Sequence, residues 1–293
     1  MKNGVCIHAE QPLSKSNSAV MKGLISHLED IAFEVIMEES FFSYSGLGRF
    51  LDHLSRQGRI TPLREWDGDN GVILRHDVDF DLKAAKRMSS IEMEKDIRST
   101  FFVLLTSRFY NPLHSENRQI LRAMCKDGFE VGLHFDPTVY GDIDEEEMGC
   151  KMALEASVLS EATGVPVDSV SLHNPSVHGR YPLFKGLHNA YDPDIFSDAN
   201  YISDSCMDFR GKDPFSFVER AKSNTVQVVL HPMHYSEAGG DYLDIFNGHI
   251  EGVVEDIELQ FRGNKTFERL IEPGSLRSGL EKRAMSRART CER

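Results

Sequence analysis

Residues 71–81 read GVILRHDVDFD, an apolar run followed by acidic side chains at Asp77, Asp79 and Asp81. The apolar start predicts a buried strand, in which the side chains at i, i+2 and i+4 point to the same face. Carboxylates held that close repel one another unless a cation lies among them or one of them takes a proton. The stretch therefore has two interpretations: a solvated turn, since Asp is common at strand ends, or the edge of a cation site.

Further apolar runs follow this stretch, and segments with a helical pattern separate them. Strands that alternate with helices predict a parallel α/β sheet or barrel. Asp81 stands at the start of the first helical segment, so we expect it to be an N-cap and not a catalytic group. The expected strands are 71–76, 99–105, 129–135, 167–173 and 225–231, and the expected helices are 81–96, 115–128 and 144–164.

The two ends of the chain lack this alternation. Apolar residues recur at helical spacing within residues 41–60, whereas the last segment is rich in Arg and poor in apolar residues. We therefore expect a helical N-terminal extension at 1–70, a (β/α) barrel at 71–270 and a basic, flexible C-terminal tail at 271–293.

The composition is that of an ordinary folded protein. The 293 residues suffice for one large domain or two smaller ones, and a hydrophobic content of 40% suffices for a sizeable core. The formal net charge of −13 argues against nonspecific binding to nucleic acid or to a membrane surface, although a local Arg or Lys can still hold a small anionic substrate. The five cysteines are scattered and none forms a CxxC pair, so they indicate neither a disulfide framework nor a thiolate zinc site.

Two features of the sequence bear on its compartment. Residues 1–17 lack an apolar core of signal-peptide length, and no stretch approaches the ~18 apolar residues that a membrane span needs. The odd number of cysteines fits a reducing compartment. We therefore expect a cytoplasmic protein without a membrane span, and the sequence leaves oligomerisation open.

Three histidines stand at the ends of predicted strands. His134, His173 and His231 each follow an apolar run, as Asp77 and Asp79 follow the first one. The carboxyl ends of parallel strands meet at one edge of a sheet or barrel, so these side chains are expected to lie together. One Asp and two His form a typical ligand set for a divalent metal with an open position, most of all for zinc.

The order of these motifs along residues 72–235 resembles that of the polysaccharide deacetylase family, the NodB-type carbohydrate esterases of family four. RHDVD is similar to the family's first motif, EVGLH to its second and VVLHPMHY to its last. YISDSCMDFRG looks like the segment whose Asp orients a catalytic histidine. The chain resembles a divergent branch with an HDVD motif, and the resemblance implies a distorted (β/α) barrel.

The resemblance also implies a role for each matching residue. Asp77 would be the general base, and His231, oriented by Asp204, the general acid. Asp79 and His134 would bind the metal. Water activated by that metal would attack an N-acyl group, and the amine would leave with a proton from the histidine.

The chain departs from the family pattern at two positions, of which the first concerns the metal. The second motif usually has another His four residues after the first, but Thr138 stands there. We expect His173 to replace this ligand, which gives an Asp79–His134–His173 site. If His173 does not reach the metal, the site is weak and the protein is an inactive relative.

The second departure is the absence of the third-motif Arg, in whose place the sequence reads SLHNPS. Either Arg75 or Arg210 is expected to make the missing contact with the base. Polar residues near the strand ends are candidates for contact with substrate, although Asn in such loops also serves turns alone. The candidate substrate-binding residues are Arg75, Asn174, Arg210, His234 and Tyr235.

The resemblance predicts a metal-dependent amidohydrolase that removes an N-acetyl group from an N-acetylated sugar or glycan precursor. The absence of a secretion signal favours a nucleotide-linked or lipid-linked sugar over a cell-wall polymer. Two alternatives are a hydrolase of a non-sugar amide or ureide, and an inactive barrel that acts as a binding protein. Bound metal distinguishes either enzyme from the binding protein, and amine release from N-acetylated sugars distinguishes the two enzymes.

Overall fold

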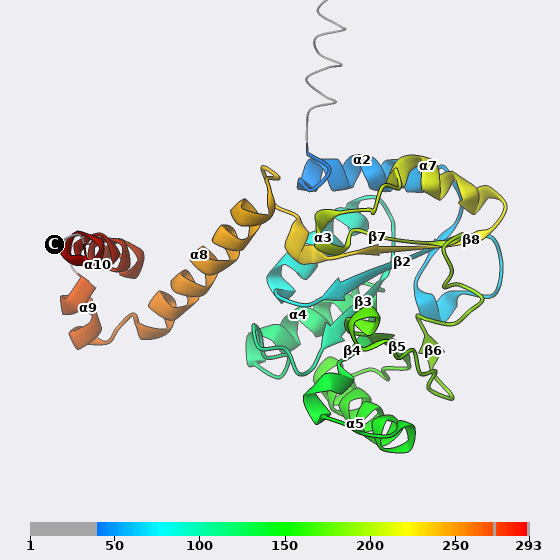
Figure 1. Cartoon of the computed structure of the whole chain (residues 1–293), viewed down its shortest axis with the longest axis horizontal. Coiled ribbons are helices and arrows are strands. Elements are labelled where there is room, and N and C mark those ends of the chain that lie inside the picture. The colour runs from blue at the N-terminus through cyan, green and yellow to red at the C-terminus, as the bar shows by residue number, and fades with distance from the viewer. Residues whose placement is uncertain (1–39, 272–273, 292–293) are drawn as a thin grey trace, which may run out of the picture. The chain divides into compact units, whose positions relative to one another are not determined.

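Eight strands form one parallel sheet in the computed structural model, which describes residues 40–271 and 274–291. Seven of them follow the order β6-β5-β4-β3-β2-β8-β7, and β1 pairs with the first half of β2. The sheet curls into a half-barrel that is open between β6 and β7, which are not paired in the described residues (Figure 1). The strands are β1 (Ile60–Thr61), β2 (Gly71–Val78), β3 (Thr100–Leu104), β4 (Glu130–Phe135), β5 (Ser169–Leu172), β6 (His188–Asn189), β7 (Tyr201–Ser203) and β8 (Thr225–Leu230).

The architecture confirms the expected distorted (β/α) barrel. The five expected strands appear as β2, β3, β4, β5 and β8, and the three expected helices appear as α3, α4 and α5. The α-helices are α2 (Tyr44–Leu54), α3 (Leu82–Glu94), α4 (Ser115–Lys126), α5 (Glu145–Thr163), α6 (Pro175–His178), α7 (Pro214–Val218), α8 (Tyr242–Phe261), α9 (Lys265–Ile271) and α10 (Leu276–Cys291). Short 3₁₀ turns lie at Leu63–Glu65, Pro137–Tyr140, Ser205–Met207, Glu219–Lys222 and Pro232–His234.

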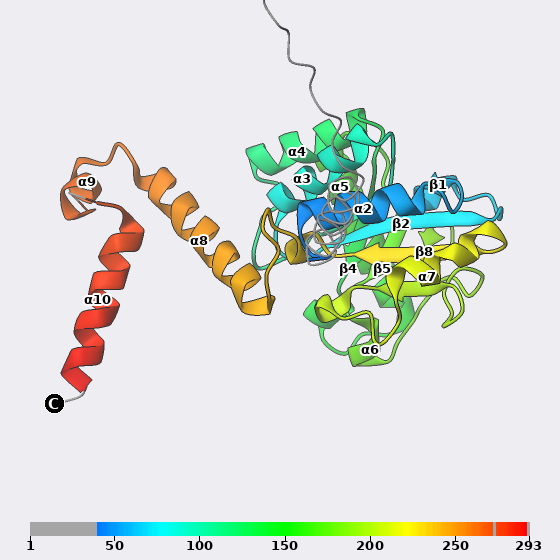
Figure 2. The same ribbon diagram turned by 90° about the horizontal axis from the view of Figure 1, so that it is seen from above.

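β2 is the central strand, and all of its residues are buried. It lies between β3 and β8, with Asp77 paired to Phe102 and His76 paired to Leu230. Figure 2 shows β2 and β8 side by side. All of these pairings are parallel, so the strands end at the same edge of the sheet. The residues that follow the strands are therefore brought together, as the sequence pattern predicts.

Capping residues begin the helices that follow β2 and β4. The carboxylate of Asp81 accepts a hydrogen bond of 2.7 Å from the backbone N–H of Lys83, which confirms its expected role as the N-cap of α3. Asp144 caps α5 in the same way, and Gly164 ends that helix in a left-handed conformation with φ of 80°. α3 packs against α4 and α4 packs against α5, so the three helices form one layer beside the sheet (Figure 1).

The segment before β2 belongs to the same core as the barrel. α2 confirms the helix expected within residues 41–60, and it packs against α3 and α7. The compact unit that holds the barrel begins at Phe41, whereas residues 1–39 of the expected extension lie outside the described residues. The fully buried side chains of α2 are Leu47, Phe50, Leu51 and Leu54.

The basic segment at the C-terminus contains the helix α10, and its expected flexibility stays a prediction. Arg277 of α10 makes ion pairs with Glu251 of α8 at 2.7 Å and with Glu281 at 3.0 Å. The i,i+4 pair of Arg277 with Glu281 and good helix-forming residues favour a helix even where apolar residues are few. None of the helices in the described part of the chain is long and apolar enough for a bilayer span.

Candidate active site

Side chains from five strand ends meet at the carboxyl edge of the sheet. They come from the end of β2 (Asp77 and Asp79), from β4 (His134) and from the residues after β5 (His173), β7 (Asp204) and β8 (His231). All except the buried Asp204 line one cavity of about 300 Å³.

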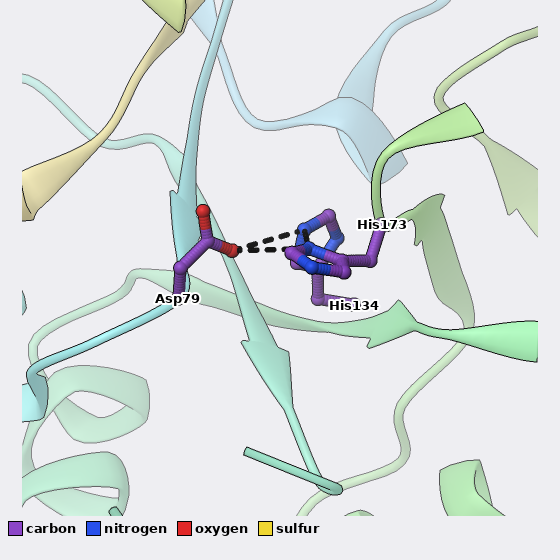
Figure 3. Close-up of side chains that lie close together, drawn as sticks. All are labelled: Asp79, His134 and His173. Carbon is purple, nitrogen blue, oxygen red and sulfur yellow. Dashed lines mark hydrogen bonds and ion pairs between the residues drawn. The ribbon is translucent and has the colours of Figure 1, made fainter. Parts of the chain in front are cut away.

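Asp79, His134 and His173 form a triangle of potential ligand atoms (Figure 3). Asp79 Oδ1 lies 3.3 Å from His134 Nε2 and 3.4 Å from His173 Nδ1, and the two nitrogens are 3.2 Å apart. A zinc ion with tetrahedral bonds of roughly 2.0–2.1 Å requires ligand atoms about 3.3–3.4 Å from one another. The three atoms have the spacing that one such ion needs, so these residues fit a divalent metal.

The ring of His134 is oriented by the neighbouring strand. Its Nδ1 lies 3.3 Å from the carbonyl oxygen of Ser171, which can only accept a hydrogen bond, so Nδ1 carries the proton. If a cation is held in the triangle, this tautomer presents the lone pair of Nε2 to it. His134 and Ser171 are partners in the register of β4 and β5, so strand pairing fixes the ring.

His173 faces the triangle with the other ring nitrogen. Its Nδ1 points to Asp79, and its Nε2 lies 2.9 Å from the side-chain amide of Asn174. If Nδ1 holds a cation, Nε2 must carry the proton, and the amide must accept that proton through its oxygen. A flip of the amide brings its oxygen to this position, because the two ends of the group have the same shape.

Thr138 takes no part in the triangle. Its hydroxyl donates a hydrogen bond of 2.6 Å to Asp136 Oδ1 within the 3₁₀ turn that follows β4. The third potential ligand comes instead from the end of the next strand, where His173 lies. The structure therefore brings together the three residues that the sequence proposed as ligands.

The two histidines favour the ionised form of Asp79. Burial alone would raise the pKa of Asp79, but hydrogen bonds and charge interactions with His134 and His173 lower it well below its usual range. Burial also opposes protonation of His173, yet Asp79 raises the pKa of that ring above its usual value. The half-buried carboxylate of Asp79 thus stabilises positive charge within the triangle.

Arg75 and Asp77 form an ion pair beneath the cavity. Arg75 Nη2 donates a hydrogen bond to Asp77 Oδ2 at 3.1 Å, and its guanidinium also donates to Gln227 Oε1 at 3.1 Å and to the Tyr191 hydroxyl at 3.2 Å. The Arg75 side chain is fully buried, so its position fits the contact with the expected base and not the contact with substrate. Asp77 Oδ1 has no hydrogen-bond partner among the described residues.

Asp204 orients His231 from within the core. Its carboxylate accepts hydrogen bonds from Nδ1 of His231 at 2.5 Å and from the backbone N–H of the same residue at 3.0 Å, which leaves Nε2 for the cavity. Burial disfavours the charged ring, but Asp204 outweighs this effect and raises the pKa of His231 to about 9. Burial would raise the pKa of Asp204, but His231 lowers it to about 2. The ring of His231 is therefore charged at neutral pH.

His234 is the second ring held by Asp204. Its Nδ1 lies 3.2 Å from Asp204 Oδ2, and its side chain is buried. These two residues and His231 are also close enough to be considered as a metal site. However, 2.5 Å between Asp204 and His231 is a hydrogen-bond distance, too short for two ligands of one ion. The group is a carboxylate that orients two rings.

The remaining expected substrate contacts have different positions. Asn174 and Arg210 line the cavity. Tyr235 is only 4% exposed and packs against Phe41 and Phe42, with ring centroids 6.3 and 5.7 Å away. Its position is in the core and not at the cavity.

The partners of Arg75 and the aromatic wall of the cavity were missed by the sequence analysis. Gln227 is a polar residue in the middle of the apolar run TVQVVL, and this was the available signal for a buried polar partner. The aromatic residues lie in segments without a clear periodicity. They are Tyr181, Tyr191, Phe196, Tyr201 and Phe209.

Comparison with known proteins gives matches among solved structures. No family model and no curated protein matches the chain. A chitin deacetylase from the fungal pathogen Colletotrichum lindemuthianum is similar at 15% identity and a TM-score of 0.40, over 62% of this chain and 81% of that chain. A peptidoglycan deacetylase from Bacillus subtilis is similar at 14% identity and a TM-score of 0.38, over 66% of this chain and 98% of that chain. The structural likeness is to CE4 deacetylases.

The CE4 family also supplies a match without enzymatic activity. A CE4 family pseudoenzyme from Bacillus anthracis is similar at 14% identity and a TM-score of 0.37, over 64% of this chain. The match covers 62% of the pseudoenzyme, which is less than two thirds of its length. Identities and TM-scores this low assign no activity to this chain, whose function follows from the residues of the site.

Proposed function

We propose that the protein is a metal-dependent N-deacetylase that acts on an N-acetylated sugar or glycan precursor. The observation that carries the proposal is the triangle of Asp79, His134 and His173, with Asp77 and His231 lining the same cavity. A carboxylate and two imidazoles favour zinc among divalent ions. When bound, such an ion lowers the pKa of a water molecule and polarises a carbonyl group.

Asp77 is the proposed base. Arg75 holds Oδ2 by a hydrogen bond of 3.1 Å, whereas Oδ1 has no partner among the described residues. Oδ1 is therefore the atom that accepts a proton from the attacking water. The buried guanidinium fixes the orientation of the carboxylate and compensates its charge before the reaction begins.

His231 is the proposed acid. Hydrogen bonds to Asp204 fix its ring, and its pKa of about 9 keeps the ring charged at neutral pH. Nε2 faces the cavity and donates its proton to the nitrogen of the amide as the C–N bond breaks. The products are acetate and an amine, and Asp77 and His231 thus divide proton acceptance and proton donation between them.

The proposal is tested by metal content and amine release, measured on the wild type, His173→Ala and His188→Ala. His188 is an exposed histidine on β6, so its variant is a matched control for the loss of an imidazole. We expect about one zinc per chain in the wild type and in the control, and loss of zinc from His173→Ala. We also expect free amine from N-acetylated sugars with the wild type and His188→Ala, and none with His173→Ala.

Other results would favour the alternatives. Full zinc content without amine release from any N-acetylated sugar, but with turnover of a cyclic ureide, would assign a non-sugar amide as substrate. A wild type that keeps its fold but takes up no metal after supplementation would contradict both enzyme functions and favour a binding protein.

A further inference from the structure

An apolar groove of about 740 Å³ lies between the barrel and α8. Phe80 and Phe109 line it from the barrel, and α8 contributes Ile250, Val253 and Leu259. These three α8 side chains are 63%, 53% and 64% exposed. Soluble proteins rarely leave a large contiguous apolar patch uncovered unless it binds something. The volume is within the usual range for a ligand site.

The groove continues into the candidate active site. Phe80, Phe109 and Phe246 line both the groove and a second cavity of about 430 Å³, and Asp79 and His173 of the triangle also line this cavity. The rings of Phe80 and Phe109 are stacked, with centroids 3.9 Å apart. An elongated ligand can therefore reach from the triangle to α8 along an aromatic wall.

Arg108 stands where the cavity and the groove meet. It lines the second cavity beside Phe109, and its exposed guanidinium has no hydrogen bond or ion pair with any residue that the structure describes. By contrast, Lys83 at the groove is paired with Asp256 at 2.7 Å. A free guanidinium binds phosphate oxygens well, because its planar donors match them in pairs.

Two contacts hold α8 beside the barrel and so define the groove. His249 Nε2 lies 3.1 Å from the backbone oxygen of Met233, and Asp256 makes the ion pair with Lys83. Gly248 and Gly252 line the groove, and a Cβ added at either position would meet no atom within 4 Å. The groove therefore has free space against the backbone of α8.

We propose that this groove holds the hydrocarbon chain of the substrate, so that the substrate is an N-acetylated sugar joined through a phosphate to a lipid carrier. The inference rests on the proposed deacetylase function, which places the acetyl group at the triangle. The phosphate then lies at Arg108, and the chain follows the stacked rings of Phe80 and Phe109 toward α8. A nucleotide carrier would need polar partners for its ribose and base, whereas the α8 side of the groove offers mainly apolar side chains.

The test is the binding of farnesyl phosphate to the full-length protein by isothermal titration calorimetry, below the concentration at which the probe forms micelles. Isopentenyl phosphate and inorganic phosphate are the short-chain and chain-free comparisons. We expect farnesyl phosphate to bind at least tenfold more tightly than either. Equal affinity for all three would overturn the inference, because the chain would then contribute nothing.

Three variants locate the binding site. Gly252→Leu fills the groove and improves helix propensity, so it is expected to fold and to weaken farnesyl phosphate binding at least tenfold. Gly149→Leu is the matched control, because Gly149 is a helical glycine of α5 that also has no atom within 4 Å of an added Cβ. Arg108→Gln is expected to weaken binding of farnesyl phosphate but not of farnesol. Equal effects of Gly252→Leu and Gly149→Leu would place the chain elsewhere.

The same titrations distinguish this inference from the proposed function. Tight, chain-dependent binding without amine release would contradict the deacetylase and leave the groove as a lipid phosphate site. Amine release from N-acetylated sugars without chain-dependent binding would support the deacetylase and contradict the lipid phosphate site. A change of oligomeric state in Gly252→Leu, seen by light scattering, together with no lipid binding by the wild type would assign the groove to a second copy of the chain and overturn the inference.

Discussion

Arg75 and Asp77, two residues apart on β2, form a buried ion pair of 3.1 Å whose carboxylate also lines the candidate active site. The family that the sequence resembles has an arginine for this contact on a separate motif. Here the same strand supplies both partners, because side chains at i and i+2 of a strand share one face. A single strand therefore positions both the proposed base and the cation that holds it.

The first prediction concerns the stability of this pair. Arg75→Met leaves a buried carboxylate without its cation, and we expect the free energy of unfolding to fall by about 3–5 kcal/mol. Adding Asp77→Asn should restore part of the loss, because the unpaired charge is then removed. Urea denaturation of the wild type, both single variants and the double variant measures the coupling. Strictly additive effects would show that the two side chains do not interact.

The second prediction concerns the side chain that orients His173. Asn174→Asp keeps an acceptor for the Nε2 proton, whereas Asn174→Leu removes it. We expect Asn174→Leu to weaken zinc binding about 10–100-fold and Asn174→Asp to retain it, as for other residues that orient a metal-binding histidine. Competition with a chromogenic chelator measures both affinities. Equal zinc affinity of the two variants would rule out this positioning role.

The third prediction is the alkaline limit of activity. The proposed reaction needs His231 protonated, and the pKa of this ring is about 9 because Asp204 stabilises its charge against the effect of burial. We expect kcat/KM to fall as the pH rises through about 9. Asp204→Asn should move this limb to lower pH, since a neutral amide no longer stabilises the charged ring. If the alkaline limb of Asp204→Asn lies at the same pH as that of the wild type, the limb reports the titration of another group.

The fourth prediction concerns the effect of His231 and Asp204 on the pH dependence of the free energy of unfolding. The pKa of His231 is about 9 in the folded state against an ordinary value of 6.5, so its stabilisation is complete below pH 6.5 and is lost as the pH rises through about 9. The pKa of Asp204 is lowered from 3.8 to about 2, so its stabilisation is present above pH 3.8 and is lost as the pH falls through about 2. Urea denaturation between pH 7 and 10 should show a decline for the wild type, on the order of 1–3 kcal/mol, and a smaller decline for Asp204→Asn.

The fifth prediction concerns the close packing beside His134. A Cβ at Gly132 of β4 would lie 2.5 Å from the ring of Phe102, which is itself fully buried beside Arg75. We expect Gly132→Ala to destabilise the fold by about 1–3 kcal/mol through overpacking. Gly149→Ala in α5 is the control and should stabilise it by about 0.5–1 kcal/mol, because its Cβ meets no neighbour. Thermal unfolding measures both, and a neutral Gly132→Ala would mean that Phe102 has room to move.

The central part of the fold was predictable because its elements are long and regular. β2, β3, β4, β5 and β8 lie in segments rich in apolar residues, and Gly164 and Asp81 mark helix ends by ordinary capping chemistry. β6 and β7 have two and three residues, which is too short for any periodicity to be recognised. β1 was missed for the same reason, and only its pairing with β2 defines it.

The residues of the candidate site were predictable where they stand at the end of a predicted strand. His134 and His173 follow apolar runs, and the parallel sheet brings those ends together. The depth of a side chain within the barrel could not be predicted in this way, because it depends on how the sheet curls and on which side chains fill the interior. The sequence therefore could not show that Arg75 lies beneath the cavity or that Tyr235 packs in the core.

Thr138 has a consequence for how this site can change over evolutionary time. In the family pattern its position carries a histidine that is tied to the metal, but here the hydroxyl bonds only to Asp136, and the residue lines the second cavity. With His173 in the triangle, Thr138 is released from selection for coordination. Substitutions there can reshape the wall of the second cavity while the triangle is preserved. Divergence of substrate preference among close homologues should therefore concentrate at this position.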